Sequence, residues 1–236
     1  MHRWRSRGRG GYRFAFVAVV ASLLLSIYAP AFAQDTPVPP AEPTSSRPLR
    51  GSVGPFYGMA RNSPAGKYFG MTPDRDHYFF GVHATVILAE GHGWSFSYAP
   101  ELTPVLILTN NPKYRVLPYD DGHASLTIED GIAPVLGFGF APVGIESTRA
   151  VTSRVKVYGG GTLGAVLFSR QTPVLNARAF NYTFDFGGGV LYDVTSRVRL
   201  RLGYKFHHLS NAKSAIRNPG VDGKVWLVGI ERTFGH

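Results

Sequence analysis

The chain has 236 residues, of which 44% are hydrophobic and 13% aromatic, and it contains no cysteine. The absence of cysteine excludes a disulfide scaffold and a cysteine-ligated metal site, and the apolar content is too high for a disordered chain. The formal net charge is +10, which by itself would suit an anionic partner such as nucleic acid or an anionic lipid surface.

The first 33 residues have the parts of a secretory signal peptide. A basic segment precedes the apolar run Phe14–Tyr28, and Ala31, Phe32 and Ala33 form an A-x-A cleavage site. The apolar run is shorter than the ~20 residues that a membrane-spanning helix needs. Removal of residues 1–33 takes away five arginines and no acidic residue, which leaves 20 Lys and Arg against 15 Asp and Glu. Export and this smaller charge of +5 argue against nucleic-acid binding.

Residues 34–50 contain five prolines among serine, threonine and charged residues, which predicts an extended linker. From residue 51 onward the apolar residues recur with a period of two, and no segment of helical period follows the signal peptide. Clusters of Gly, Pro, Asn and Asp separate the alternating segments. We therefore expect one β-barrel domain over residues 51–236, with eight strands. Their expected positions are 52–60, 77–89, 93–107, 131–143, 151–168, 181–194, 196–210 and 223–234.

Strands of this length, in an even number and after a signal peptide, are typical of an antiparallel outer-membrane β-barrel with up-and-down topology. The alternative is a soluble periplasmic barrel or sandwich. Residues 196–206 argue against it, because their second face has too many basic side chains for a dry core. These are Arg197, Arg199, Arg201 and Lys205. We expect them to point into the barrel and to pair with acidic residues there. The candidates are Asp185, Asp193 and Glu231.

Segment 206–223 concentrates polar residues between two alternating strands. His208 and Ser210 are two residues apart, so on a strand they share one face, as a general base and a serine nucleophile would. That face is the apolar one, where a polar pair is energetically unfavourable and therefore suggests a functional role. Asp222 is the nearest acid that could orient the histidine, and the Asn211 amide is a candidate donor to an oxyanion. The alternative is that this H-x-S pair arises by chance.

The sequence HLSNAKSAIRNPGVD, residues 208–222, resembles the signature of the PagL-like lipid A 3-O-deacylase family: an H-x-S-N-A segment, then N-P-G, then an acidic residue. The signal peptide and the eight-strand pattern extend the resemblance over most of the chain. The resemblance implies an eight-stranded barrel in the Gram-negative outer membrane. It also implies a serine esterase that hydrolyses the 3-O-linked acyl chain of lipid A without a cofactor.

The same resemblance implies roles for individual residues. Ser210 resembles the nucleophile, His208 the general base and Asn211 an oxyanion contributor, while Asn218 matches an asparagine of the supporting N-P-G turn. Asp222 stands where the best-known members carry the glutamate that orients the histidine. Its carboxylate is one methylene shorter and must reach the imidazole by a small shift of the loop. Asp fills this role in many serine hydrolases.

Two other functions stay open on the sequence alone. One is a non-enzymatic structural or adhesive outer-membrane barrel, in which the H-x-S-N segment is only a turn at a strand end. The other is a barrel phospholipase that acts on glycerophospholipid. The expected partners are lipid A or lipopolysaccharide and outer-membrane lipid, with no nucleic acid and with a homodimer left open.

The remaining histidines and the basic loop residues carry weaker expectations. His207 has the opposite parity to His208 and is expected in the barrel interior. The other histidines have no ligand-like spacing and predict no metal site. These are His77, His83, His92 and His123. Basic residues of the linker and loops, Lys67 among them, are expected to be solvated, with contact to lipid A phosphates as the alternative.

Overall fold

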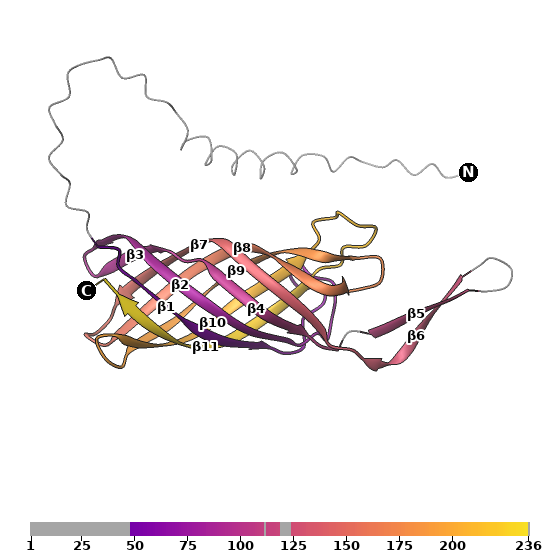
Figure 1. Ribbon diagram of the computed structural model, residues 1–236, viewed down its shortest axis with the longest axis horizontal. Helices are drawn as coiled ribbons and strands as arrows, with labels where there is room; N and C mark the ends of the chain where they lie inside the picture. The colour runs from indigo at the N-terminus through magenta and orange to yellow at the C-terminus, as the bar shows by residue number, and fades with distance from the viewer. Residues whose placement is uncertain (1–47, 111, 119–123, 236) are drawn as a thin grey trace, which may run out of the picture. The chain divides into compact units, whose positions relative to one another are not determined.

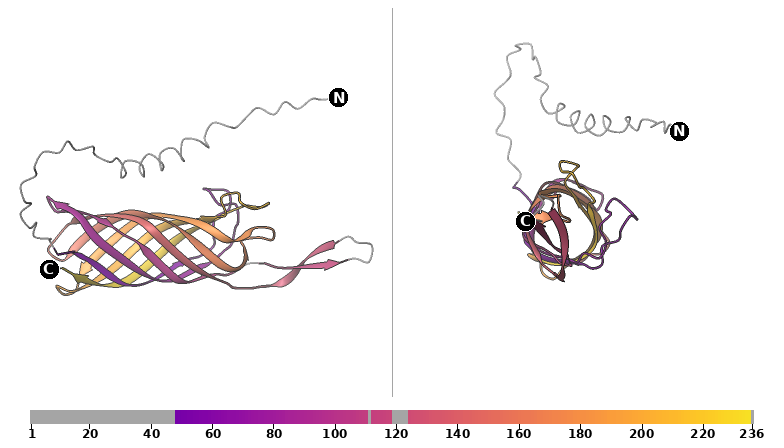
Figure 2. Two further views of the ribbon diagram at one scale, coloured as in Figure 1. Left: turned by 45° about the horizontal axis from the view of Figure 1, so that its top comes forward. Right: turned by 90° about the vertical axis from the view of Figure 1, so that its right-hand side faces the viewer.

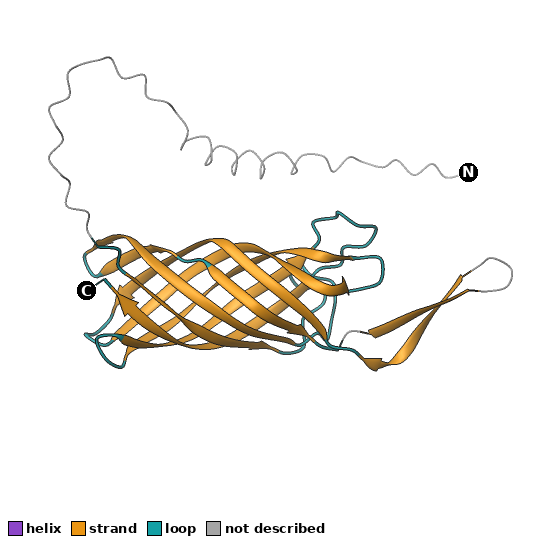
Figure 3. Cartoon of the chain, viewed as in Figure 1, coloured by secondary structure: helices purple, strands orange, loops and turns teal. Residues whose placement is uncertain are grey.

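The computed structural model describes residues 48–110, 112–118 and 124–235. The predicted signal peptide and nearly all of the predicted linker lie outside these residues. Every regular element of the described chain is a β-strand, as the period of two predicts (Figure 3). Within the same residues, no helix is long and apolar enough to cross a membrane.

The strands close into one antiparallel barrel (Figures 1 and 2). Its wall consists of β1 (Gly51–Ala60), β2 (His77–Gly91), β3 (Trp94–Tyr98), β4 (Glu101–Leu108), β7 (Val135–Ala150), β8 (Val155–Thr172), β9 (Arg178–Asp193), β10 (Val198–Ser210) and β11 (Val221–Phe234). β1 closes the ring by pairing with both β2 and β11. β3 and β4 together fill one position in the wall, because both pair with β2 on one side and β7 on the other. The prediction of an eight-stranded up-and-down barrel is confirmed.

Two residues interrupt the predicted strand 93–107 without opening the wall. Pro100 has no N–H to donate to a neighbouring strand, so regular pairing stops there. The flanking backbone still reaches both neighbours: Ala99 N–H donates to Gly144 O at 2.9 Å, and Ala84 N–H donates to Pro100 O at 3.2 Å. The sheet therefore stays closed across the interruption.

The connection between β4 and β7 holds a second sheet that was not predicted. β5 (Pro112–Pro118) and β6 (Ala124–Ile132) pair antiparallel as a two-stranded hairpin. The prolines at the ends of β5 suggested a loop, but proline is compatible with the end of a strand that has a free edge. The hairpin adds no strand to the barrel wall.

In β7 the alternating residues point to opposite sides of the barrel wall. Leu136, Phe138 and Phe140 point outward with 56%, 53% and 51% of their surface exposed. Gly137 and Gly139 alternate with them on the inner side and are buried. A row of large exposed apolar side chains is unfavourable in water and suits a lipid environment.

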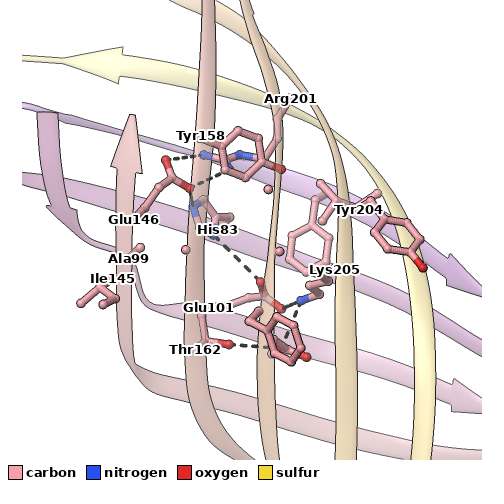
Figure 4. Close-up of a pocket in the computed structure, with 18 residues that line it drawn as sticks. His83, Ala99, Glu101, Ile145, Glu146, Tyr158, Thr162, Arg201, Tyr204 and Lys205 are labelled. Atoms are coloured by element: carbon pink, nitrogen blue, oxygen red, sulfur yellow. Dashed lines mark hydrogen bonds and ion pairs between the residues drawn. The ribbon is translucent and has the colours of Figure 1, made fainter. Parts of the chain in front are cut away.

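Oppositely charged side chains pair with one another in the barrel interior (Figure 4). Arg201 donates to Glu146 at 2.8 and 3.1 Å and also pairs with Glu231. Its guanidinium lies 4.2 Å from the ring centre of Tyr158. The three charged side chains are at most 5% exposed. Because buried charges are stable only with partners, this part of the interior forms a polar core in which the charges compensate one another.

Two further inward-facing basic residues have acidic partners as well. Lys205 donates to Glu101 at 2.8 Å and to Asp185 at 3.3 Å. Arg199 donates to Asp193 at 2.6 Å. The three acidic residues predicted to pair with basic side chains inside the barrel all do so.

The two ends of the barrel differ in the length of their connections. β1 begins and β11 ends at the same end, where Gly51 pairs with Phe234. The turns at this end are short: 92–93, 151–154 and 194–197. Arg197, predicted to point inward, is exposed in the last of them. The connections at the opposite end are longer: 61–76, 109–134, 173–177 and 211–220. Outer-membrane barrels keep short turns in the periplasm and longer loops outside, so the second end is the outer one.

Candidate active site

The last two strands place a histidine and an aspartate side by side at the outer end of the barrel. β10 and β11 pair with His208 directly opposite Asp222, so both side chains stand on the same face of the sheet. His208 Nδ1 lies 2.7 Å from Asp222 Oδ1. His208 is 7% exposed and Asp222 is fully buried. A carboxylate on Nδ1 leaves Nε2 of the imidazole available, which is the arrangement that a general base needs.

A loop from the start of the barrel holds the second oxygen of Asp222. The β1–β2 loop, residues 61–76, brings Phe69 N–H and Gly70 N–H to Asp222 Oδ2 at 3.0 and 2.8 Å. Both carboxylate oxygens are therefore hydrogen-bonded, which fixes the orientation of the side chain. Gly70 permits this close approach, because a Cβ there would lie 2.8 Å from the Asp222 backbone nitrogen.

Two more backbone hydrogen bonds join the same loop to the turn that precedes β11. Met71 N–H donates to Pro219 O at 2.6 Å, and Thr72 N–H donates to Gly220 O at 3.2 Å. Gly220 has a φ of +64°, and a Cβ at this position would lie 2.9 Å from His208 Cε1. The loop and the turn therefore pack directly over the histidine.

Aromatic rings cover His208 although it stands on the outward face of β10. The rings of Phe184 and Phe69 lie 5.0 and 5.7 Å from its imidazole, centre to centre. Phe206 contacts both of these phenylalanines and is 8% exposed. The cover lowers the local dielectric, which strengthens the hydrogen bond between the histidine and its aspartate.

Ser210 ends β10 two residues beyond His208, on the same side of the strand and opposite Tyr182 of β9. The serine is half-buried. Within the described part of the chain, no hydrogen bond joins its hydroxyl to His208. A hydrogen bond between nucleophile and base often tightens only in the complex with substrate. The structure thus brings His208 and Asp222 together, while the role of Ser210 stays a prediction.

The two asparagines of the motif organise the loop after β10. Asn211 N–H donates to Asn218 Oδ1 at 2.9 Å, and Asn211 Nδ2 donates to Arg217 O at 2.8 Å. Asn211 is 1% exposed. An amide nitrogen carries two hydrogens, so one remains for another acceptor. Asn218 supports the loop through its side-chain oxygen, and the predicted oxyanion role of Asn211 depends on that second hydrogen.

His207 points the other way, into the barrel interior, as its parity predicts. Its Nδ1 lies 2.5 Å from Asp185 Oδ1, and the residue is 3% exposed. Its ring also packs 5.6 Å from His77 and 5.0 Å from Phe79, centre to centre. The wall of the barrel separates this histidine from the outward face that carries His208.

The interior also has a small cavity among charged side chains, which turn toward one another (Figure 4). His83 lies 4.0 Å from Glu101 and 3.6 Å from Glu146. Among the residues that the structure describes, no group of three His, Cys, Asp or Glu side chains is arranged to hold a metal ion. We assign this cavity to the packing of the interior, because its acidic groups already have basic partners.

The contribution of Phe69 and Gly70 was missed in the sequence. Phe69 lies 153 residues before Asp222, and a Phe-Gly pair in a loop is too common to indicate a role. The contact arises because barrel closure brings β1 beside β11. Only the three-dimensional arrangement could reveal it.

A family model bears on the family of this chain, and a solved structure bears on its fold. A family model described as lipid A 3-O-deacylase (PagL) matches residues 90–230, which is more than half of the chain and includes the candidate site. No curated protein matches the chain. The crystal structure of the outer membrane enzyme PagL matches with a TM-score of 0.50 and 13% identity, covering 77% of this chain and 97% of that one.

Two further solved structures are also similar. Neisserial surface protein A has a TM-score of 0.46 and 13% identity and covers 78% of this chain and 97% of its own. Ail of Yersinia pestis has a TM-score of 0.40 and 12% identity, with 78% and 99% covered. At 13% identity the likeness to the PagL crystal structure concerns the fold alone, whereas the family model carries the assignment. This β-barrel of the Gram-negative outer membrane belongs to the lipid A 3-O-deacylase family.

Proposed function

We propose that this protein is a serine esterase that hydrolyses the 3-O-linked acyl chain of lipid A. The observation that carries the proposal is the 2.7 Å hydrogen bond between His208 Nδ1 and Asp222 Oδ1, two residues from Ser210 at the outer end of the barrel. A purely structural or adhesive barrel needs no buried imidazole–carboxylate pair beside a serine on its outward face.

The first half of the reaction forms an acyl-enzyme. Ser210 Oγ attacks the ester carbonyl carbon while His208 Nε2 accepts the hydroxyl proton. The tetrahedral intermediate then collapses, the bond between the carbonyl carbon and the sugar 3-oxygen breaks, and His208 returns the proton to that oxygen. Asp222 holds the imidazole in its tautomer and stabilises the imidazolium while it lasts.

The second half releases the fatty acid. Water gives a proton to His208 and attacks the acyl-serine carbonyl, and the collapse of this intermediate restores the Ser210 hydroxyl with the same proton. The second Nδ2 hydrogen of Asn211 is proposed to stabilise the oxyanion in both halves. His208 therefore acts as the general base in both steps, and the proposed reaction uses no cofactor.

The position of the site suits a substrate that stays in the membrane. Leu202 and Trp226 lie on the outward faces of β10 and β11 with 56% and 67% of their surface exposed. Their outward face continues toward His208 and Ser210 at the outer end of β10. An acyl chain lying along this apolar wall would bring its ester to the serine without leaving the hydrocarbon.

The test is mass spectrometry of lipid A from Gram-negative cells that express the wild type, Ser210→Ala or Ser196→Ala. Ser196 is an exposed serine in the turn at the opposite end and is the matched control. The wild type and the control are expected to remove one hydroxyacyl group, and Ser210→Ala none.

The same samples address the alternatives. Unchanged lipid A together with increased lysophospholipid would favour a phospholipase. No lipid change with a correctly folded wild-type barrel would favour a structural role and contradict the proposal.

A further inference from the structure

Two lysines approach the same tyrosine ring beside the candidate active site. Lys67 Nζ lies 5.6 Å and Lys224 Nζ lies 5.7 Å from the ring centre of Tyr68. The two ammonium groups are therefore no further apart than the sum of these distances. Two exposed cations on one ring give this surface a local positive potential, which attracts anions.

Neither ammonium group forms an ion pair within the described part of the chain. A cation of the same loop does form one: Arg61 lies 4.0 Å from Asp76. Lys67 and Lys224 are both exposed. The lysine pair is thus available to an anion from outside the protein.

The pair is tied closely to the catalytic residues. Tyr68 directly precedes Phe69, whose N–H binds Asp222, and its ring lies 5.4 Å from Phe206, centre to centre. Phe206 is directly opposite Lys224 in the pairing of β10 with β11. Lys224 therefore stands two residues from Asp222 on the same face of β11, so an anion held there would be next to the site.

The surroundings are those of a membrane boundary. Phe69 and Met71 of the same loop are each 62% exposed, and Lys224 continues the outward row that contains Trp226. Lysines at such a boundary extend their ammonium groups toward the lipid headgroups. Headgroup anions are the compensating charges that this position offers.

We propose that Lys67, Tyr68 and Lys224 form a binding site for a sugar-linked phosphate of the lipid substrate. A phosphate dianion that reaches both ammonium groups would accept charge-assisted hydrogen bonds from each of them. The inference rests on the proposed esterase function and adds a requirement to it. The preferred substrate carries its phosphate close to the ester that is cleaved.

The test compares three esters with purified protein in a neutral detergent, so that the charge of a bilayer makes no contribution. The esters are phosphorylated lipid A, the same lipid A after removal of its phosphates, and p-nitrophenyl dodecanoate. The variant is Lys67→Gln combined with Lys224→Gln. Lys213→Gln is the matched control, because Lys213 is an exposed lysine in the 211–220 loop.

We expect the wild type and the control to have a KM about tenfold lower for phosphorylated than for dephosphorylated lipid A, as the loss of charge-assisted contacts predicts. In the double variant this ratio is expected to fall to about one. A preference that survives in the double variant, or that is lost equally in the control, would overturn the phosphate site.

The p-nitrophenyl ester separates this inference from the proposed function. If the wild type hydrolyses all three esters and its KM is the same for phosphorylated and dephosphorylated lipid A, the phosphate site is contradicted. The proposed esterase function is then unaffected. No hydrolysis of any ester by the wild type would contradict the esterase itself. Phosphatidic acid that competes as strongly as phosphorylated lipid A would overturn the assignment to a sugar-linked phosphate, because the site would then accept any lipid phosphate.

Discussion

Two neighbouring histidines of β10 form the same kind of pair on opposite sides of the barrel wall. His207 Nδ1 is bonded to Asp185 inside, and His208 Nδ1 is bonded to Asp222 outside, at 2.5 and 2.7 Å. Both histidines are less than a tenth exposed. The two pairs have the same chemical groups. The reason that only the His208 pair is a candidate for catalysis must therefore lie in the residues around each pair.

The surroundings differ in two respects. Asp185 also accepts from Lys205 and Thr162, at 3.3 and 3.1 Å, and belongs to the interior ion network. Asp222 instead accepts from backbone N–H groups of a loop at the outer end. His207 Nε2 is buried and has no hydrogen-bond partner among the residues that the structure describes, whereas His208 has a serine two residues away on its own face. An imidazole–carboxylate pair thus becomes a candidate catalyst only where substrate can reach it.

The largest expected effect separates the two histidines directly. His208→Asn should lower kcat on lipid A by at least ~10³-fold, because the general base is lost. His207→Asn should change kcat no more than a few-fold, because its ring lies inside the wall. Rates are measured per folded barrel, with folding scored by the heat-dependent shift in electrophoretic mobility. Equal losses in both variants would remove the distinction between the two pairs.

The carboxylates should differ in the same direction. Asp222→Asn is expected to lower kcat by about 10³-fold, because an amide at Nδ1 favours the wrong tautomer of His208. Asp185→Asn should mainly lower the stability of the barrel, since it leaves Lys205 with one acidic partner instead of two. Steady-state kinetics and urea unfolding of both variants measure the two effects. A fully active Asp222→Asn protein would show that another group orients the histidine.

A smaller effect is expected from the loop that holds Asp222. Gly70→Ala places a Cβ within 2.8 Å of the Asp222 backbone nitrogen, so the loop must shift and release its two hydrogen bonds. We expect kcat to fall by at least roughly tenfold, which corresponds to the loss of one hydrogen bond to a charged group. Gly91→Ala is the matched control, because its Cβ would have no neighbour within 4 Å. If both variants keep the wild-type kcat, the β1–β2 loop covers the site but does not position Asp222 for catalysis.

The smallest effect on activity is expected deep in the interior. Arg201→Met leaves Glu146 and Glu231 without their guanidinium partner, which should lower the free energy of unfolding by about 3 kcal/mol or more. The kcat of the folded fraction should stay within about twofold of the wild type, because Arg201 lies on the inner face. Urea unfolding in detergent micelles together with esterase kinetics tests this. A large loss of kcat at normal stability would link the interior network to catalysis.

Much of this architecture follows from periodicity. The alternation in β10 assigned Arg199, Arg201 and Lys205 to one face and His208 to the other, and the ion pairs inside the barrel agree with that assignment. The number of strands could also be predicted from the sequence. Each strand of an up-and-down barrel pairs with its neighbours in sequence, so the alternating segments can be counted along the chain. The β5–β6 hairpin was missed, since prolines at both ends of β5 obscured a short strand pair.

The sequence by itself predicted a signal peptide, and it determined the barrel class, the faces of the strands and the candidate residues His208, Ser210 and Asp222. These depend on local composition and on a period of two, which are properties of short segments. The tertiary structure alone decided that residues 69–72 pack over the site and that Lys67 and Lys224 meet on Tyr68. The physical reason is closure: pairing of β1 with β11 brings the first loop of the barrel against its last strand. No local pattern encodes a contact between segments so distant in the chain.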